Sequence, residues 1–400
     1  YYTEPQMKAR EADEPGSRSH NRQAWRRQQC EQHMAEAMEP VDAASLRTVQ
    51  RVGTLALPGA PTQLLLHEYD PHLVTASDGD LVSVFDWREA RLVSSFHNGN
   101  RAGSDITALT FVNEEVDALL LAGSADGDVR LYRHYDRAST ARHGPELVSA
   151  FRALPDLLRS KYPSGLHVAW QQVSGRLLVG GDTRLVRLWD AHRELCIADV
   201  PTRVNSCATA LTCDRDIGHL YMAAFGDGSI GVYDQRNPPS SSLVRLWEEH
   251  AAWVHELHLQ RHGARELVSA SVDGEVRVWD IRAGSSVLQS TVPSDHGALS
   301  GLSVHDRLPV CALTSAPVAT GPTVSHAAWL CDLRDLRPIG TPYVRTLHPP
   351  APLAPRRTRE WWTVPPSQYA RSTSRVAFHP HDALLAVSGP DTGVELLHYQ

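Results

Sequence analysis

The sequence predicts an all-β protein, a seven-bladed β-propeller preceded by a short helical segment. One observation is a recurring phrase: an acidic turn, an alternating strand and a closing aromatic residue, found five times. A second is its period, since the closing aromatics are 47, 57, 44 and 46 residues apart, close to the repeat length typical of four-stranded blades. These aromatics are Phe85, Tyr132, Trp189, Tyr233 and Trp279.

Each copy has the pattern of a strand that follows a tight turn. From about residue 52 onward the hydrophobic period is two, so one face of each strand is expected to pack on a neighbouring blade. Asp-Gly pairs such as Asp273–Gly274 suit the turns, because Gly accepts positive φ and Asp bonds to its own backbone. The combination is typical of the WD40 repeat. We expect structural roles for the aromatic–Asp pairs Trp189–Asp190, Tyr233–Asp234 and Trp279–Asp280.

Two degenerate copies complete the ring. Residues 298–332 predict a sixth blade, and residues 374–400 predict a seventh that has only three strands. The apolar segment Val52–Pro58 can supply the missing strand by pairing near Val394–His398. Such closure joins the two ends of the ring and leaves no open sheet edge between them. The propeller is therefore predicted to span residues 51–400.

The remaining segments are an N-terminal linker and two insertions. Residues 1–50 are polar, and Ser19–Met38 contains good helix formers without Gly or Pro, so we expect a helical linker. Insertions at 133–164 and 347–372 explain blades that are longer than usual, and long insertions lie on the loop faces of a propeller. The first insertion has helical spacing at Leu147, Phe151, Leu154 and Leu158.

Composition narrows the function classes. A net charge of −7 gives no basic surface for nucleic acid, and apolar runs of strand length predict no direct membrane insertion. Six cysteines without a CxxC pair are typical of free thiols in a reducing, cytoplasmic setting. The chain begins with Tyr1 and has no secretory leader, so we expect a piece of a longer cytoplasmic protein.

No catalytic, cofactor or metal site is predicted. The sequence has no G-x-S-x-G elbow, dinucleotide fingerprint or P-loop, although composition alone does not exclude a Ser–His–Asp triad. His255 and His258 lie in an alternating segment that is unlike the HExxH motif, which favours structural histidines over zinc ligands.

The fifth copy predicts a hydrogen-bonded set of three side chains. WD repeats often place a His before the first strand, hydrogen-bonded to a Ser or Thr and to the Trp of the third strand. His250, Ser269 and Trp279 occur in that order. A buried indole N–H needs such an acceptor, so this set is expected to be architectural.

The Pro-rich insertion at 347–372 contains the candidate partner contacts. They are Arg356, Arg357, Trp361 and Trp362, and Arg and Trp are enriched at binding hot spots. Two readings remain open: the paired indoles anchor a partner, or they fold back onto a blade.

Several strings resemble one family. FDWREARLVSSFHNGN at 85–100, GDTRLVRLWD at 181–190, GDGSIGVYDQR at 226–236 and AFHPHDALLAVSG at 377–389 resemble successive blades of the Raptor family, scaffold subunits of the target-of-rapamycin (TOR) kinase complex. The resemblance covers about 52–400. It implies a non-enzymatic scaffold propeller in nutrient-responsive TOR signalling and growth control. The implied partners are TOR kinase, other subunits of its complex and small GTPase regulators, at a cytoplasmic location that can be peripheral to the lysosome or vacuole.

Two other function classes remain open. The Asp-x-Arg boxes at Asp234–Arg236, Asp280–Arg282 and Asp332–Arg334 can dock a propeller adaptor, which favours a substrate receptor of a cullin–RING ubiquitin ligase. Against this, Arg is common at that position, where its stem covers the strand end. An enzyme with an unrecognised triad is the third class.

Overall fold

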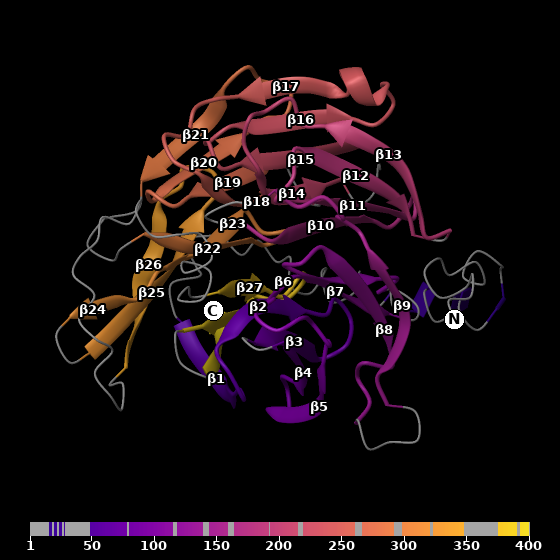
Figure 1. The fold of residues 1–400 in the computed structure, drawn as a ribbon. Coiled ribbons are helices and arrows are strands. Elements are labelled where there is room, and N and C mark those ends of the chain that lie inside the picture. Colours follow the sequence, from indigo (N-terminus) through magenta and orange to yellow (C-terminus); the bar gives the residue numbers. More distant parts are fainter. Residues whose placement is uncertain are drawn as a thin grey trace.

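Seven antiparallel sheets form the blades of a ring in the computed structural model (Figure 1). The first strands of the blades contact one another in a closed cycle, so they line the axis of a propeller. The predicted all-β, seven-bladed architecture is confirmed. The structure describes residues 16–17, 20–21, 24–25, 28 and 49–399, without 78–79, 115–117, 139–143, 159–163, 192, 215–218, 261–265, 292–297, 321–322, 348–374 and 390–392.

Five blades have four strands in chain order, from the axis outward. Blade 1 is β2 (Pro61–Leu66), β3 (His72–Ser77), β4 (Leu81–Asp86) and β5 (Arg91–His97), and blade 2 is β6 (Ile106–Val112), β7 (Leu119–Ser124), β8 (Asp128–Arg133) and β9 (Glu146–Arg152). Blade 3 is β10 (Leu166–Gln171), β11 (Arg176–Gly181), β12 (Leu185–Asp190) and β13 (Leu195–Pro201). Blade 4 is β14 (Ala208–Cys213), β15 (Leu220–Phe225), β16 (Ile230–Asp234) and β17 (Leu243–Trp247), and blade 5 is β18 (Val254–Leu259), β19 (Leu267–Ser271), β20 (Glu275–Trp279) and β21 (Ser286–Thr291).

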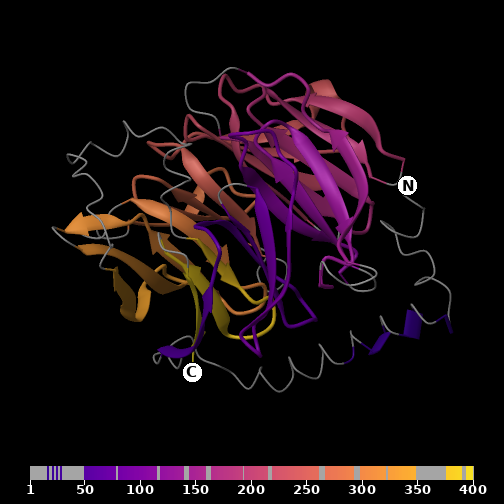
Figure 2. The same cartoon turned by 60° about the horizontal axis from the view of Figure 1, so that its bottom comes forward.

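Blade 7 joins the two ends of the ring, as predicted. It consists of β27 (Val376–Phe378), β28 (Leu384–Ser388), β29 (Gly393–Tyr399) and the N-terminal strand β1 (Val49–Ala56). β1 pairs antiparallel with β29, and Leu55 lies opposite Val394. Figure 2 shows indigo β1 beside the yellow C-terminal strands. The strand lies about two to three residues earlier than the predicted Val52–Pro58.

Blade 6 contains the strands predicted within residues 298–332 and an additional outer strand after them. β22 (Leu299–Val304), β23 (Val310–Ser315) and β25 (Thr323–Asp332) are followed by the outer strand β26 (Pro338–Leu347), and β24 (Val318–Thr320) adds a fifth strand. β25 and β26 are each ten residues long, and with β24 they project from the ring (Figure 1).

The helical interpretation of the 133–164 insertion is wrong. Glu146–Arg152 is β9, the outer strand of blade 2, paired along β8. Leu147 is exposed, and Val148 and Ser149 are both buried where the β8–β9 ladder has a bulge, so Leu147 does not belong to a buried helical stripe. A short apolar segment can fit the periodicity of a helix and that of a strand. Here the free edge of β8 favours the strand, because pairing with it satisfies the backbone hydrogen bonds of the segment.

Before β1, the N-terminal segment is described at only seven positions. Five of them, residues 20, 21, 24, 25 and 28, are helical, and the extent of the helix stays a prediction. Over the described residues, no helix is long and apolar enough to cross a membrane.

Inner strands are bonded to one another around the axis. The hydroxyl of Thr62 donates to the carbonyl oxygen of Ile106 at 3.2 Å, between blades 1 and 2, and that of Thr107 donates to Leu166 at 2.8 Å, between blades 2 and 3. Thr209 makes the same kind of bond to Val254, between blades 4 and 5. In all three cases the Thr is the second residue of its inner strand, and for Thr62 and Thr107 the ladder has a bulge at that residue. The bulge turns a hydroxyl toward the neighbouring blade.

Candidate functional site

The buried polar centre of blade 5 is built by its second and third strands and the loop before its first. Ser269 Oγ lies 2.7 Å from His250 Nε2 and accepts a hydrogen bond from Trp279 Nε1 at 2.8 Å. His250 Nδ1 lies 2.8 Å from Glu275 Oε2. The structure therefore brings the three predicted side chains together and adds an acidic fourth.

Charges around this centre are paired within the blade. Arg277 donates to Glu275 at 2.9 Å and also bonds to Glu249 in the loop before β18. Burial lowers the pKa of His250 although Glu275 opposes the shift, so the imidazole stays neutral near pH 7. Sequence reasoning missed Glu275 and Glu249, because the alternation of β20 does not reveal which charged residues face inward.

The other closing aromatics are satisfied in different ways. Tyr132 donates to Asn98 Oδ1 at 2.9 Å, and Tyr233 donates to the carbonyl oxygen of Thr202 at 2.7 Å. The indole N–H of Trp189 is buried and has no hydrogen-bond partner among the residues that the structure describes. Burial raises the pKa of Tyr132 to about 12, so its hydroxyl remains a donor.

The Asp residues that follow the aromatics end their strands. Asp190 accepts from the backbone N–H of Arg193 at 3.0 Å, and Asp280 accepts from that of Arg282 at 2.9 Å. Asp234 binds Arg236 through both backbone and side chain, and this hydrogen bonding lowers the pKa of Asp234. These carboxylates are therefore used within their own turns.

Asp273 and Gly274 form the turn before β20. Asp273 Oδ1 accepts from the backbone N–H of Glu275 at 3.2 Å, and Gly274 has φ +94°, a conformation that glycine adopts without strain. The turn sits at the same end of blade 5 as the loop that carries His250, because β18 and β19 are antiparallel and Val254 at the start of β18 lies opposite Ser271 at the end of β19.

The FHNGN string forms a fixed loop between blades 1 and 2. Asp80 accepts from the backbone N–H groups of Gly99 at 2.9 Å and Asn100 at 3.0 Å, and His97 lies 2.7 Å from its other oxygen. Burial alone would raise the pKa of Asp80, but the hydrogen bond to His97 and these two backbone bonds lower it. The loop is thus pre-ordered on the face that carries the acidic turns.

Histidines at the opposite face were missed by the sequence reasoning. His305 and His379 follow the inner strands of blades 6 and 7, and each accepts two backbone N–H groups at Nδ1. Arg307 donates to His381 at 3.2 Å, and His381 lies 3.2 Å from Glu68 of blade 1. These contacts connect blades 6, 7 and 1 on that face. The FHPH string contains two of these residues and was a signal that could have indicated them.

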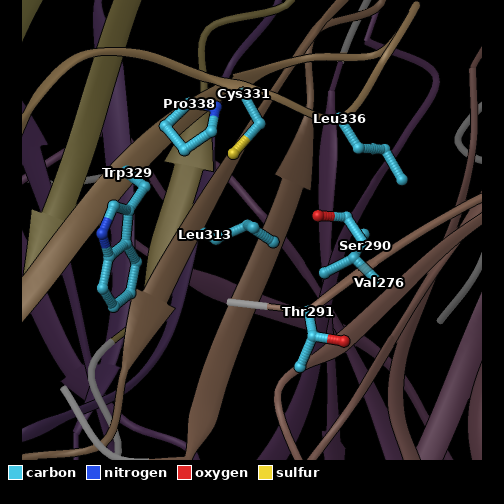
Figure 3. Close-up of a pocket in the computed structure, with 8 residues that line it drawn as sticks. All are labelled: Val276, Ser290, Thr291, Leu313, Trp329, Cys331, Leu336 and Pro338. Carbon is cyan, nitrogen blue, oxygen red and sulfur yellow. The ribbon is translucent and has the colours of Figure 1, made fainter. Parts of the chain in front are cut away.

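A cavity of about 170 Å³ lies at the seam between blades 5 and 6 (Figure 3). Its walls are mostly apolar, with the Trp329 indole on one side and the Ser290 hydroxyl on the other. The principal lining residues are Val276, Ser290, Leu313, Trp329, Cys331 and Leu336.

The candidate partner contacts Arg356, Arg357, Trp361 and Trp362 lie outside the described residues. Within the described part of the chain, no group of three or more His, Cys, Asp or Glu side chains could hold a metal ion. His255 Nδ1 lies 3.2 Å from the carbonyl oxygen of Ala270.

Comparisons with known proteins give the relationship. A family model described as "WD domain, G-beta repeat" matches residues 241–280. The "Target of rapamycin complex 1 subunit mip1" of Schizosaccharomyces pombe is 38% identical over 317 residues, which cover 79% of this chain and 24% of the relative. The corresponding subunit KOG1 of Saccharomyces cerevisiae is 36% identical over 326 residues, covering 78% and 21%.

A solved structure agrees with these matches. The crystal structure of Chaetomium thermophilum Raptor superimposes with a TM-score of 0.75 at 31% identity, covering 96% of this chain and 31% of that chain. The chain is a homologue of Raptor over its propeller. It spans about a fifth to a quarter of the length of the curated relatives it matches. The family resemblance predicted from the sequence strings is confirmed, and the matches favour it over the ubiquitin-ligase alternative.

Proposed function

We propose that this Raptor-like propeller is a non-enzymatic scaffold module that supports assembly of a TOR kinase complex and its response to nutrients. The observation that carries the proposal is the match to subunits of target of rapamycin complex 1 across most of the chain. Because the chain covers only part of those relatives, its own partners are inferred from them.

The physical basis is a rigid ring. Blade 7 closes through β1, and hydroxyl bonds such as Thr107 to Leu166 connect neighbouring inner strands. A closed ring holds its loops at fixed distances from one another, so several partners can be bound in a defined arrangement. His250, Ser269, Trp279 and Glu275 hydrogen-bond to one another within blade 5, which favours architecture over catalysis.

The inferred partners are TOR kinase, the other subunits of its complex and small GTPase regulators. Binding to such partners would place the protein in the cytoplasm and, peripherally, at the lysosome or vacuole surface. Neither nucleic acid nor direct membrane insertion is part of the proposal.

Affinity purification of the full-length parent protein followed by mass spectrometry tests the assignment. TOR kinase among the recovered proteins is the expected result, and recovery of a cullin with its adaptor in place of TOR would overturn it. Arg282→Ala is a matched probe, because Arg282 is exposed and belongs to one Asp-x-Arg box. The substitution should leave TOR recovery unchanged, whereas a ligase receptor would lose adaptor.

The insertion at 347–372 gives a second prediction. Replacing Trp361 and Trp362 with Ala in the full-length protein should weaken recovery of complex subunits, because adjacent indoles near arginines are typical binding anchors. The unfolding temperature of the chain should stay nearly unchanged. A fall of many degrees would mean instead that the indoles pack against a blade.

A further inference from the structure

The seam between blades 5 and 6 differs from the other seams at one position. In blades 1 to 6, the residue three before the closing aromatic pairs across the ladder with a residue of the outer strand, and in blade 7 the equivalent pair is Val394, three before Leu397, with Leu55. Val82 pairs with Phe96, Val129 with Phe151, Ile230 with Trp247 and Val276 with Ser290.

That outer-strand residue fills the seam to the next blade. Phe96 packs on Tyr132 with ring centroids 4.7 Å apart, and Phe151 packs on Trp189 at 4.8 Å. Trp247 stacks on Trp279 at 4.7 Å with an interplanar angle of 26°. In three seams, therefore, an aromatic ring from one blade covers the closing aromatic of the next.

Larger side chains also occupy this position in the remaining seams. Val200 belongs to the apolar cluster around Tyr233, and Leu55 belongs to the cluster around Phe85. Arg345 in β26 faces Glu395 of blade 7 at 3.5 Å. Only the seam between blades 5 and 6 has a residue as small as serine there.

The cavity lies at the seam position where the outer strand of blade 5 has Ser290. Ser290 and Trp329 both line it, and Trp329 is the closing aromatic of blade 6, at the same ladder irregularity as Trp279 in blade 5. The walls are completed by Leu313 and Cys331 on the same face of β23 and β25. At about 170 Å³ the space resembles apolar cavities that hold benzene.

We propose that this seam is a binding site for a small planar aromatic molecule of benzene to indole size. Such a ring takes the place that Trp247 has against Trp279 one seam earlier, and it stacks on Trp329. The Ser290 hydroxyl points toward the cavity in Figure 3 and can bond to a polar atom at the edge of the ligand. Val276 and Leu313 contact its faces and exclude water.

Fluorobenzene, observed by ¹⁹F NMR with the full chain, tests the site. Saturable broadening of its resonance is expected for the unchanged chain. Ser290→Phe places in the seam the ring that blades 1 and 2 already supply, so it should weaken fluorobenzene binding by at least about tenfold. Ser290→Thr is the matched control, because it stays small and should retain binding.

Thiol labelling provides the second readout. Cys331 lines the cavity, so saturating fluorobenzene should slow its modification by methyl methanethiosulfonate, measured by peptide mass spectrometry. Cys213 is buried at another seam and should react at an unchanged rate. Absence of saturable binding, or equal binding to Ser290→Phe, would overturn the proposal. If Ser290→Phe does not fold, unchanged labelling of Cys331 would do so.

Discussion

At the residue scale, the polar group of the closing aromatic meets a different hydrogen-bonding environment in different blades. A buried indole or phenol donor must find an acceptor, or its desolvation remains uncompensated. Trp279 uses a side-chain hydroxyl, Tyr233 a backbone carbonyl and Tyr132 an amide. Trp189 keeps a buried N–H without an acceptor in the described part of the chain. The repeat pattern specifies the ring at this position, while its polar partner varies from blade to blade.

This contrast predicts unequal costs for the same substitution. Trp279→Phe keeps most of the apolar burial but removes the donor to Ser269, so we expect a loss of about 1–3 kcal/mol in the free energy of unfolding. Trp189→Phe removes an N–H that has no partner, and it should cost less. Urea unfolding of both variants measures the difference. A larger loss for Trp189→Phe would contradict the hydrogen-bond explanation.

At the element scale, β1 determines whether the ring is closed. It contributes the fourth strand of blade 7, and its buried face is continuous with blade 1 through a cluster that contains Leu55, Phe85 and Val394. The same strand also has an outward face, where Val52 is 56% exposed. One strand therefore provides both a test position and its control.

Leu55→Ala should destabilise the whole propeller. Leu55 is 1% exposed, and truncating a buried leucine leaves a cavity that costs about 2–5 kcal/mol. Val52→Ala on the same strand should change the free energy of unfolding by less than about 0.5 kcal/mol. Chemical denaturation gives both values. If Leu55→Ala behaves like Val52→Ala, strand β1 does not hold the ring together.

Strands were predictable from the sequence where the repeat pattern was strong. They were less predictable where contacts with neighbouring strands or blades determine the structure. The phrase around Trp279 and the orphan apolar segment near Leu55 predicted blade 5 and the closure. The segment at 146–152 was misread because a short apolar run fits both periodicities until its neighbour β8 is known. The cavity beside Ser290 was not predictable from the sequence, because it depends on which residues pair across the ladder and face the next blade.

At the scale of the whole molecule, buried histidines make the stability of the propeller sensitive to acid. His167, His305, His326 and His379 lie in different blades or loops, and burial lowers the pKa of each to about 4. His305 and His379 accept backbone N–H groups at Nδ1, an arrangement that protonation abolishes. Between the pKa of the folded state, about 4, and that of the unfolded state, about 6.5, each imidazole is neutral in the folded chain but protonated in the unfolded chain.

The stability of the propeller should therefore fall steeply as the pH decreases from 7 to 5. The folded pKa near 4 lies below the unfolded value of about 6.5, so the unfolded state binds more protons throughout this window. Stability is fully present above about pH 6.5 and is lost as the pH falls toward 4, by on the order of 2 kcal/mol for each histidine at pH 5.

All four shifts have the same sign, so each lowers the free energy of unfolding as the pH falls. Urea midpoints measured at intervals between pH 7 and 5 give the slope, in a range where most carboxylates stay ionised. His305→Asn retains a side-chain acceptor for the backbone N–H groups but does not titrate, so its slope should be smaller by the share of one histidine. A stability that is constant between pH 7 and 5 would show that these imidazoles titrate normally in the folded ring.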